Sequence, residues 1–222
     1  MAYNTYPIAL DLAGKRCLLV GGGQIAESKL DALLVAGADI RVVSPEVRPR
    51  FLRLAMAAAI CLHRRPYRAD DLTGAALVIA ATDDHAVNAG IVTEARAAGI
   101  LAQAVDNIPY CDFHAVAIVR RGELQVSIST NGRSPAFARW LREELDASLP
   151  VEYGDLLAVL GEVRDELKAD GPIPEYEHWR DAITDEVFTD LRQGDHASAR
   201  RRLHDRLIRA APEPAPVAGA PR

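Results

Sequence analysis

CLLVGGGQIAESK, residues 17–29, decides the fold of the first half of this 222-residue chain. Its four apolar residues predict a short buried strand, and the residues after the glycines predict a helix. Gly21, Gly23 and Ala26 match the spacing G-x-G-x-x-G/A, in which the glycines permit a tight turn and a close approach to phosphate. Glycine triplets also occur in turns that bind nothing, so the flanking strand and helix carry the prediction. We expect a dinucleotide site, with the pyrophosphate on Gly21, Gly22 and Gly23.

Outward from this motif, short apolar runs alternate with amphipathic helical patterns. The helix after the glycines carries Leu30, Leu33 and Leu34 near one stripe and ends at Gly37, a typical C-terminal glycine. Strands are predicted at residues 16–20, 39–43, 60–64, 77–80 and 101–105. Alternation of this kind is typical of βαβ units on a parallel sheet, so the fold class is α/β with a Rossmann-type domain over residues 1–112.

The pattern changes after this domain. Residues 115–119 and 124–128 read as a β-hairpin, and a helix from Pro135 to about residue 145 follows Ser134, which suits a helix cap. They form a small α+β unit, residues 113–149. Residues 150–210 read as a helical C-terminal domain, with one helix over 151–168 and two more up to about 210. The Pro/Ala-rich residues 211–222 are expected to be a disordered tail.

Composition excludes several classes of protein. Hydrophobic residues make up 49% of the chain, charged residues 26%, and the net charge is −5, which argues against a nucleic-acid partner. Cys17, Cys61 and Cys111 form no CxxC pair, which favours a reducing compartment. No apolar run reaches the roughly 18 residues of a membrane span, and the start lacks a secretory pattern. We expect a cytoplasmic protein with no membrane partner and no metal site.

Polar residues follow the predicted strands at the edge where open α/β sheets bind ligands. The second strand ends at Ser44, Pro45 and Glu46. An acidic residue about 20 positions after the glycines commonly accepts a ribose hydroxyl, while a nearby arginine accommodates the 2′-phosphate of NADP. Glu46 is slightly late and Arg48 is close, so the choice between NAD and NADP stays open, and a simple turn is the alternative.

The fourth and fifth strands end in Thr82 and Asp106. We expect the backbone of Thr82 to line the cofactor crevice, whereas Asp83 and Asp84 suit a helix N-terminus. Asp106 is a candidate general base, because a carboxylate at this edge is ionised at neutral pH. Capping of the turn before Pro109 is its structural alternative.

Five blocks together resemble a known family: VGGGQIAESK, AATDDHAVN, AVDN, CDF and IVRRGELQVSISTNGRSPAFARWLREEL. In this order and spacing they are similar to the precorrin-2 dehydrogenase/sirohydrochlorin ferrochelatase family of sirohaem synthesis, over about residues 6–167. The resemblance implies NAD-dependent oxidation of the tetrapyrrole precorrin-2 to sirohydrochlorin, for sirohaem or cobalamin. In some members insertion of ferrous iron follows.

The resemblance also implies roles for residues. Asp106 aligns with the family's catalytic aspartate, and cofactor contacts fall on Gln24, Ile25, Pro45 and Glu46, to which we add Ser44 and Thr82. Members form homodimers through the hairpin and the helix after Pro135, which makes residues 113–149 a dimerisation unit. A serine that is phosphorylated in some members aligns with Thr130, next to Ser129.

One departure from the family lies after the aspartate. Members commonly carry Phe-x-x-Pro, whereas Phe113 is followed by His114, Ala115 and Val116, so pocket shape or metal handling is expected to differ. The carboxylate arms of a tetrapyrrole favour arginines, which concentrate at positions 120, 121, 133, 139 and 142. Expected substrate contacts are Asn107, His114, Ser129, Thr130 and Arg133. A solvated basic face is the structural alternative, and a non-catalytic dinucleotide sensor is the functional one.

Overall fold

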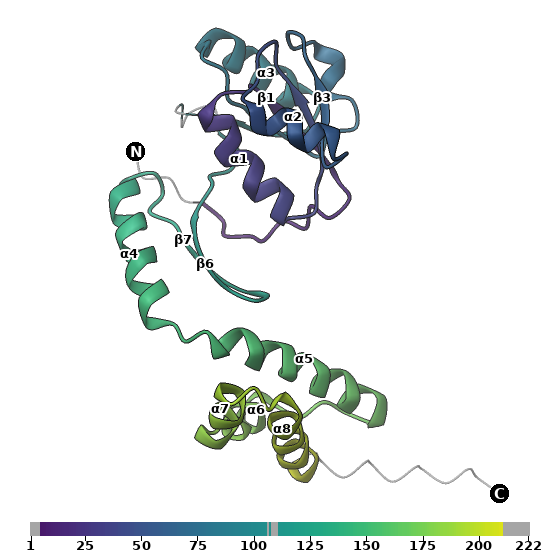
Figure 1. Ribbon diagram of the computed structural model, residues 1–222, viewed down its shortest axis with the longest axis vertical. Helices are drawn as coiled ribbons and strands as arrows, with labels where there is room; N and C mark the ends of the chain where they lie inside the picture. Colours follow the sequence, from purple (N-terminus) through teal and green to yellow (C-terminus); the bar gives the residue numbers. More distant parts are fainter. Residues whose placement is uncertain (1–4, 106, 108–110, 211–222) are drawn as a thin grey trace, which may run out of the picture. The chain divides into compact units, whose positions relative to one another are not determined.

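The computed structural model describes residues 5–105, 107 and 111–210, and the chain divides into two compact units, one ending at Ala115 and the other beginning at Val116 (Figure 1). Two predictions fall outside the described residues: the catalytic role of Asp106 and the disordered tail at 211–222.

A five-stranded parallel sheet forms the first unit, in the order β3-β2-β1-β4-β5. This order is that of five of the six strands of a Rossmann-type sheet, and it confirms the predicted fold class. The observed bounds agree with the predicted strands to within one residue: β1 (Arg16–Val20), β2 (Asp39–Val43), β3 (Cys61–His63), β4 (Leu77–Ala80) and β5 (Leu101–Ala104).

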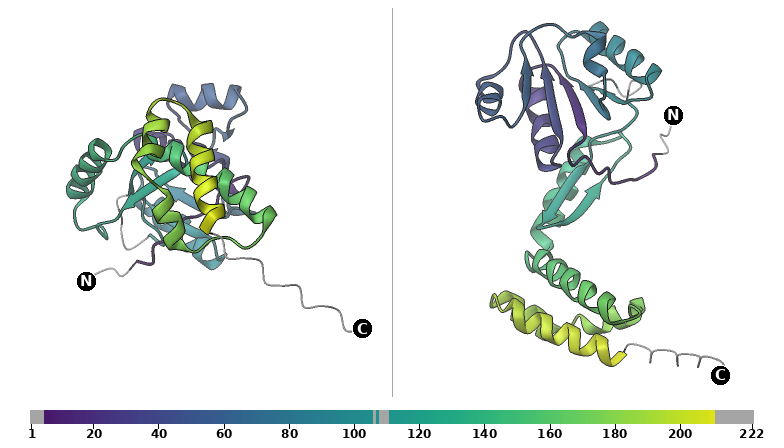
Figure 2. Two further views of the ribbon diagram at one scale, coloured as in Figure 1. Left: turned by 90° about the horizontal axis from the view of Figure 1, so that it is seen from below. Right: turned by 90° about the vertical axis from the view of Figure 1, so that its right-hand side faces the viewer.

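Alternating side chains give the sheet two buried faces. Cys17 and Leu19 of β1 pack with α1 (Gln24–Val35) and α2 (Pro49–Met56) on one face. Leu18 and Val20 pack on the other face, with α3 (His85–Ala97) and the 3-10 helix η1 (Ala69–Leu72). Figure 2 (right) shows helices on both sides of the sheet. Burial on both faces explains why the strands are continuous apolar runs. Helices α2 and η1 were not predicted from the sequence.

α1 ends as its sequence predicts. Gly37 has φ +66°, its N–H donates to the carbonyl of Leu34, and the N–H of Ala38 donates to the carbonyl of Leu33. Glycine is favoured here because the left-handed conformation closes the last helical turn without a Cβ clash.

The second unit begins with an antiparallel hairpin, β6 (Ala117–Arg121) and β7 (Leu124–Ile128). The first strand was predicted two residues too early, at 115–119. Arg121 pairs with Leu124, so the turn contains only Gly122 and Glu123. A two-residue turn extends both strands to its edges, and Gly122 supplies the positive φ, +56°, that such turns require.

Five helices follow the hairpin in the described part of the chain: α4 (Pro135–Ser148), α5 (Glu152–Asp170), α6 (Tyr176–Ala182), α7 (Asp185–Arg192) and α8 (His196–Ala210). Helices α5 to α8 lie together (Figure 1). Their apolar residues share one core, which includes Val163, Val187 and Leu203. The prediction of two helices after α5 was wrong. Extended backbone at Ile183 and Thr184 separates α6 from α7 without a glycine or proline to mark the break. No described helix is both long and apolar enough to cross a membrane.

Candidate functional site

The register of the sheet aligns the carboxyl ends of four strands. Val20 of β1 pairs with Val43 of β2 and with Ala80 of β4, and Ala80 pairs with Ala104 of β5. Gly21, Ser44, Ala81 and Val105, the residues that follow these strands, therefore leave the sheet at one edge. Because β1 and β4 lie side by side where the strand order reverses, this edge is where open α/β sheets bind ligands.

The glycine loop fits tightly between two neighbours and is open at its third position. Gly21 has φ +122°, and a Cβ there would lie 2.2 Å from the carbonyl oxygen of Ala81. A Cβ on Gly22 would lie 2.2 Å from the carbonyl oxygen of Glu46. A Cβ on Gly23 would meet nothing within 4 Å. The first two glycines are thus required by packing within the chain, and the third leaves space for a ligand.

The N-terminus of α1 faces this space without a side-chain cap. Gly23 is the N-cap, and the first intrahelical bond runs from the N–H of Glu27 to the carbonyl of Gly23, 3.0 Å. The N–H groups of the preceding first turn, which includes Gln24 and Ile25, have no partner within an α-helix. Such N–H groups and the helix dipole attract a phosphate.

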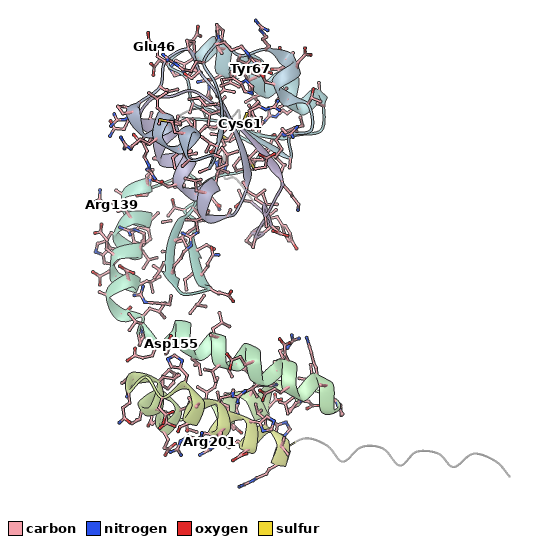
Figure 3. All side chains as sticks on the ribbon, turned by 45° about the vertical axis from the view of Figure 1, so that its right-hand side comes forward. Glu46, Cys61, Tyr67, Arg139, Asp155 and Arg201 are labelled. Atoms are coloured by element: carbon pink, nitrogen blue, oxygen red, sulfur yellow. The ribbon has the colours of Figure 1, made fainter. Side chains whose placement is uncertain are left out.

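The loop after β2 closes one side of the glycine loop. The hydroxyl of Ser44 donates to the carbonyl of Glu46, 2.6 Å, and the N–H of Arg48 donates to the carbonyl of Gly22, 3.0 Å. Ser44 is buried, so its role is to shape the loop, whereas Pro45 and Glu46 are exposed. Figure 3 shows Glu46 at the surface of the first unit.

The loop after β4 is held by a residue that sequence reasoning missed. The side chain of Asn88 in α3 accepts from the N–H and the hydroxyl of Thr82, 3.2 and 2.7 Å, and donates to its carbonyl, 2.9 Å. Both backbone groups of Thr82 are therefore engaged within the chain. Asp84 caps α3 by accepting from the N–H groups of Ala86 and Val87, as the sequence predicted.

The segment of residues 111–113 lies beside β5. Gln103 forms an antiparallel bridge with Cys111, and the thiol of Cys111 donates to the carbonyls of Ala104 and Asn107, 3.2 and 3.4 Å. Burial raises the pKa of the Cys111 thiol, which favours its protonated form. Asp106 itself lies outside the described residues.

Asp112 anchors the same segment. Its carboxylate accepts from the guanidinium of Arg96, 2.8 Å, and from the N–H of Ala102, 3.0 Å. His114 follows two residues later and is half-buried.

The remaining predicted residues belong to the second unit, in the loop before α4. The hydroxyl of Ser129 accepts from the N–H of Asn131, 3.2 Å. Thr130 donates to the carbonyl of Ser134, 3.2 Å, and Ser134 caps α4 by accepting from the N–H of Phe137, 3.1 Å. The hydroxyl groups of Ser129, Thr130 and Ser134 therefore stabilise the conformation of the loop and the start of α4.

The arginines of the second unit differ in availability. Arg121 donates to the carbonyl of Leu149 and to the carboxylate of Asp146, and only 13% of its side chain is exposed, so it holds the hairpin to the α4–α5 junction. Arg139 pairs with Glu143. Arg133 is exposed and has no ion-pair partner among the described residues, which leaves it the better candidate for a carboxylate ligand.

Other features lie apart from this edge. A cavity of about 520 Å³, lined by residues such as Thr73, Glu94 and Ile100, lies at the amino ends of β4 and β5, opposite the glycine loop. Within the described residues, no three His, Cys, Asp or Glu side chains gather in an arrangement that could hold a metal ion.

Sequence comparisons agree with this geometry. A family model described as "Putative NAD(P)-binding" matches residues 8–117, and one described as "Sirohaem biosynthesis protein central" matches residues 121–148. The chain is 38% identical over 208 residues to the siroheme synthase of Ectopseudomonas mendocina, covering 93% of this chain and 45% of that protein. It is 37% identical over 205 residues to siroheme synthase 1 of Serratia proteamaculans, covering 90% and 43%.

The chain belongs to the siroheme synthase N-terminal domain family. This confirms the resemblance drawn from the sequence blocks, and the first unit is the NAD(P)-binding part of the family. The chain spans less than half the length of the two siroheme synthases. A solved structure of SirC, precorrin-2 dehydrogenase, is similar over 90% of this chain and 100% of its own, with a TM-score of 0.70 and 25% identity.

Proposed function

We propose that this chain oxidises precorrin-2 to sirohydrochlorin with NAD⁺ as the hydride acceptor. The observation that carries the proposal is the glycine loop, closed by packing at Gly21 and Gly22 and open at Gly23, at the N-terminus of α1. The similarity to SirC, precorrin-2 dehydrogenase, along 90% of the chain supports the substrate.

The residues at the carboxyl edge of the sheet fit a dinucleotide. The first-turn N–H groups of α1 suit the pyrophosphate, with Gln24 and Ile25 beside it, and the exposed Glu46 suits a ribose hydroxyl. Ser44 and Thr82 support these contacts through the loops they hold. When bound, the nicotinamide supplies the acceptor for a hydride.

Asp106 is the proposed base. Loss of two hydrogens from the tetrapyrrole requires a proton acceptor as well as a hydride acceptor, and a carboxylate meets this need. Support comes from the family resemblance and from chain position, since the N–H of Val105 donates to the carbonyl of Ala80 at the same edge as the glycine loop. Asn107, His114, Ser129, Thr130 and Arg133 are proposed to contact the substrate.

Ferrochelatase activity is a second proposal, favoured by the siroheme synthases among the relatives. Ferrous iron is a substrate here, and Asp106 would accept pyrrole protons as the iron enters. Iron insertion assayed with sirohydrochlorin supplied tests this step separately, and a rate equal to that of the metal-only control would reject it.

We also propose a cytoplasmic homodimer. Free thiols at Cys17, Cys61 and Cys111 suit a reducing compartment. Phe137 and Trp140 of α4 stack with ring centroids 5.6 Å apart, yet each is about half exposed, which suits burial by a second copy. Sedimentation of Trp140→Glu is expected to show a monomer where the wild type is a dimer, and a monomeric wild type would reject this proposal.

The function is tested by supplying precorrin-2 and NAD⁺ anaerobically and following NADH and sirohydrochlorin together. Joint formation of the two products supports the dehydrogenase. Binding of NAD⁺ without either product would favour the sensor alternative.

A further inference from the structure

An ion pair joins the two segments that frame the expected ribose position. The Nε of Arg48, in the loop after β2, lies 2.5 Å from an Oε of Glu27 in the first turn of α1. Only 18% of the Glu27 side chain is exposed, against 51% for Arg48, so the carboxylate is the more fixed partner.

Arg48 stands where a 2′-phosphate would need a cation. In dinucleotide-binding sheets an acidic residue after the second strand accepts the 2′-hydroxyl of NAD, whereas an arginine nearby accommodates the 2′-phosphate of NADP. Arg48 lies two residues after Glu46, and its N–H is bonded to Gly22 of the glycine loop. The backbone of Arg48 is therefore fixed beside the site, and only its side chain can change direction.

We propose that Glu27 determines the preference for NAD⁺ over NADP⁺ by holding Arg48. This inference rests on the proposed dinucleotide site. The pair has no net charge, so the guanidinium that a 2′-phosphate would require is neutralised and turned toward α1. Exposed Glu46 adds a negative charge after the same strand, which disfavours a phosphate further.

The chain offers a matched control for this pair. Arg50 of α2 donates to Asp31 of α1, 3.0 Å, one helical turn along from Glu27. It joins α1 to α2, the helix that begins directly after Arg48, with the same chemistry, but lies farther along the chain from the glycine loop. A general effect of loosening α1 from the segment that follows β2, residues 44–56, would appear at both pairs. A change in the preference between the two dinucleotides should appear only when Glu27 is replaced.

The test compares dissociation constants for NAD⁺ and NADP⁺ by isothermal titration calorimetry. In Glu27→Gln the freed guanidinium can make a charge-assisted bond to the 2′-phosphate, so the ratio of the two constants is expected to move about tenfold toward NADP⁺. Adding Arg48→Ala to this variant should abolish the shift. Asp31→Asn should keep the wild-type ratio, and Arg48→Ala alone should not favour NADP⁺.

An unchanged ratio in Glu27→Gln, or an equal shift in Asp31→Asn, would overturn the inference. A shift that survives in the double variant would do the same, because it would not pass through Arg48. A wild-type chain that binds neither dinucleotide would instead overturn the proposed function together with this inference, so the two failures are distinct.

Discussion

The carbonyl oxygen of Glu46 occupies the space that a Cβ on Gly22 would need, 2.2 Å from its ideal position. The neighbouring Gly23 has φ −80° and nothing within 4 Å of its Cβ position. The two adjacent glycines therefore serve different purposes. Gly22 allows close packing against the loop after β2, and Gly23 leaves space for the proposed ligand.

Alanine substitutions at Gly22 and Gly23 separate an effect on stability from an effect on NAD⁺ binding. Gly22→Ala must displace the loop after β2, and we expect it to lower the free energy of unfolding by about 1–3 kcal/mol. Gly23→Ala should keep wild-type stability but weaken NAD⁺ binding, because its methyl group enters the pyrophosphate space. Urea denaturation and calorimetry on both variants check this, and wild-type NAD⁺ affinity in Gly23→Ala would place the pyrophosphate elsewhere.

Asn88 is expected to be the polar residue on which the loop after β4 depends. Asn88→Leu removes three hydrogen bonds and leaves the N–H and the carbonyl of the half-buried Thr82 without these partners. Unsatisfied groups of this kind cost roughly 2–4 kcal/mol in total, to be measured by urea denaturation. Thr93→Ala, on an exposed turn of the same helix, serves as the control and should change stability by less than about 0.5 kcal/mol. Equal losses in the two variants would contradict the assignment.

The pair between Arg65 and Asp71 predicts acid sensitivity. Hydrogen bonding from Arg65 holds the pKa of the buried Asp71 below its usual value, despite the opposing effect of burial. The unfolded chain then binds a proton more readily than the folded one, so this stabilisation is complete above about pH 4 and is lost as the pH falls further. Asp71→Asn should be less stable at neutral pH and lose less stability between pH 5 and pH 3. A parallel acid profile in the variant would contradict this explanation.

The sequence predicts those parts of the fold that are coded locally. Buried parallel strands are continuous apolar runs, so β1, β2 and β4 could be bounded to the residue. The first strand of the hairpin was predicted two residues too early, because the pattern Arg-Arg-Gly-Glu accommodates turns of two or four residues. Only the pairing of Arg121 with Leu124 decides between them.

The candidate site was predictable in its backbone and less so in its side chains. The glycine spacing located the proposed phosphate-binding loop. The other loops of the site could be placed beside it, because parallel strands end at the same edge of a sheet. The ion pair between Glu27 and Arg48, and the contacts of Asn88 with Thr82, join different elements, and no local pattern marks them. Arg121 was predicted as a possible carboxylate ligand, but its engagement with Leu149 depends on the packing of α4 and α5.

Asp106→Asn distinguishes an enzyme from a dinucleotide sensor. The amide keeps the size of the side chain but removes its ability to accept a proton, so turnover should fall by about 100-fold or more while NAD⁺ affinity stays within about twofold. Calorimetry and the turnover assay are made on the same preparation. Undiminished turnover in this variant would assign the base to another residue.

The proposed dehydrogenase activity is tested most directly by the anaerobic reaction of the wild-type chain with precorrin-2 and NAD⁺. The reaction is followed by absorbance at about 340 nm for NADH and by the tetrapyrrole spectrum. We predict that NADH and sirohydrochlorin rise together in equal amounts, since each hydride that leaves the tetrapyrrole reduces one nicotinamide. Saturable binding of NAD⁺ with no change in either signal would contradict it.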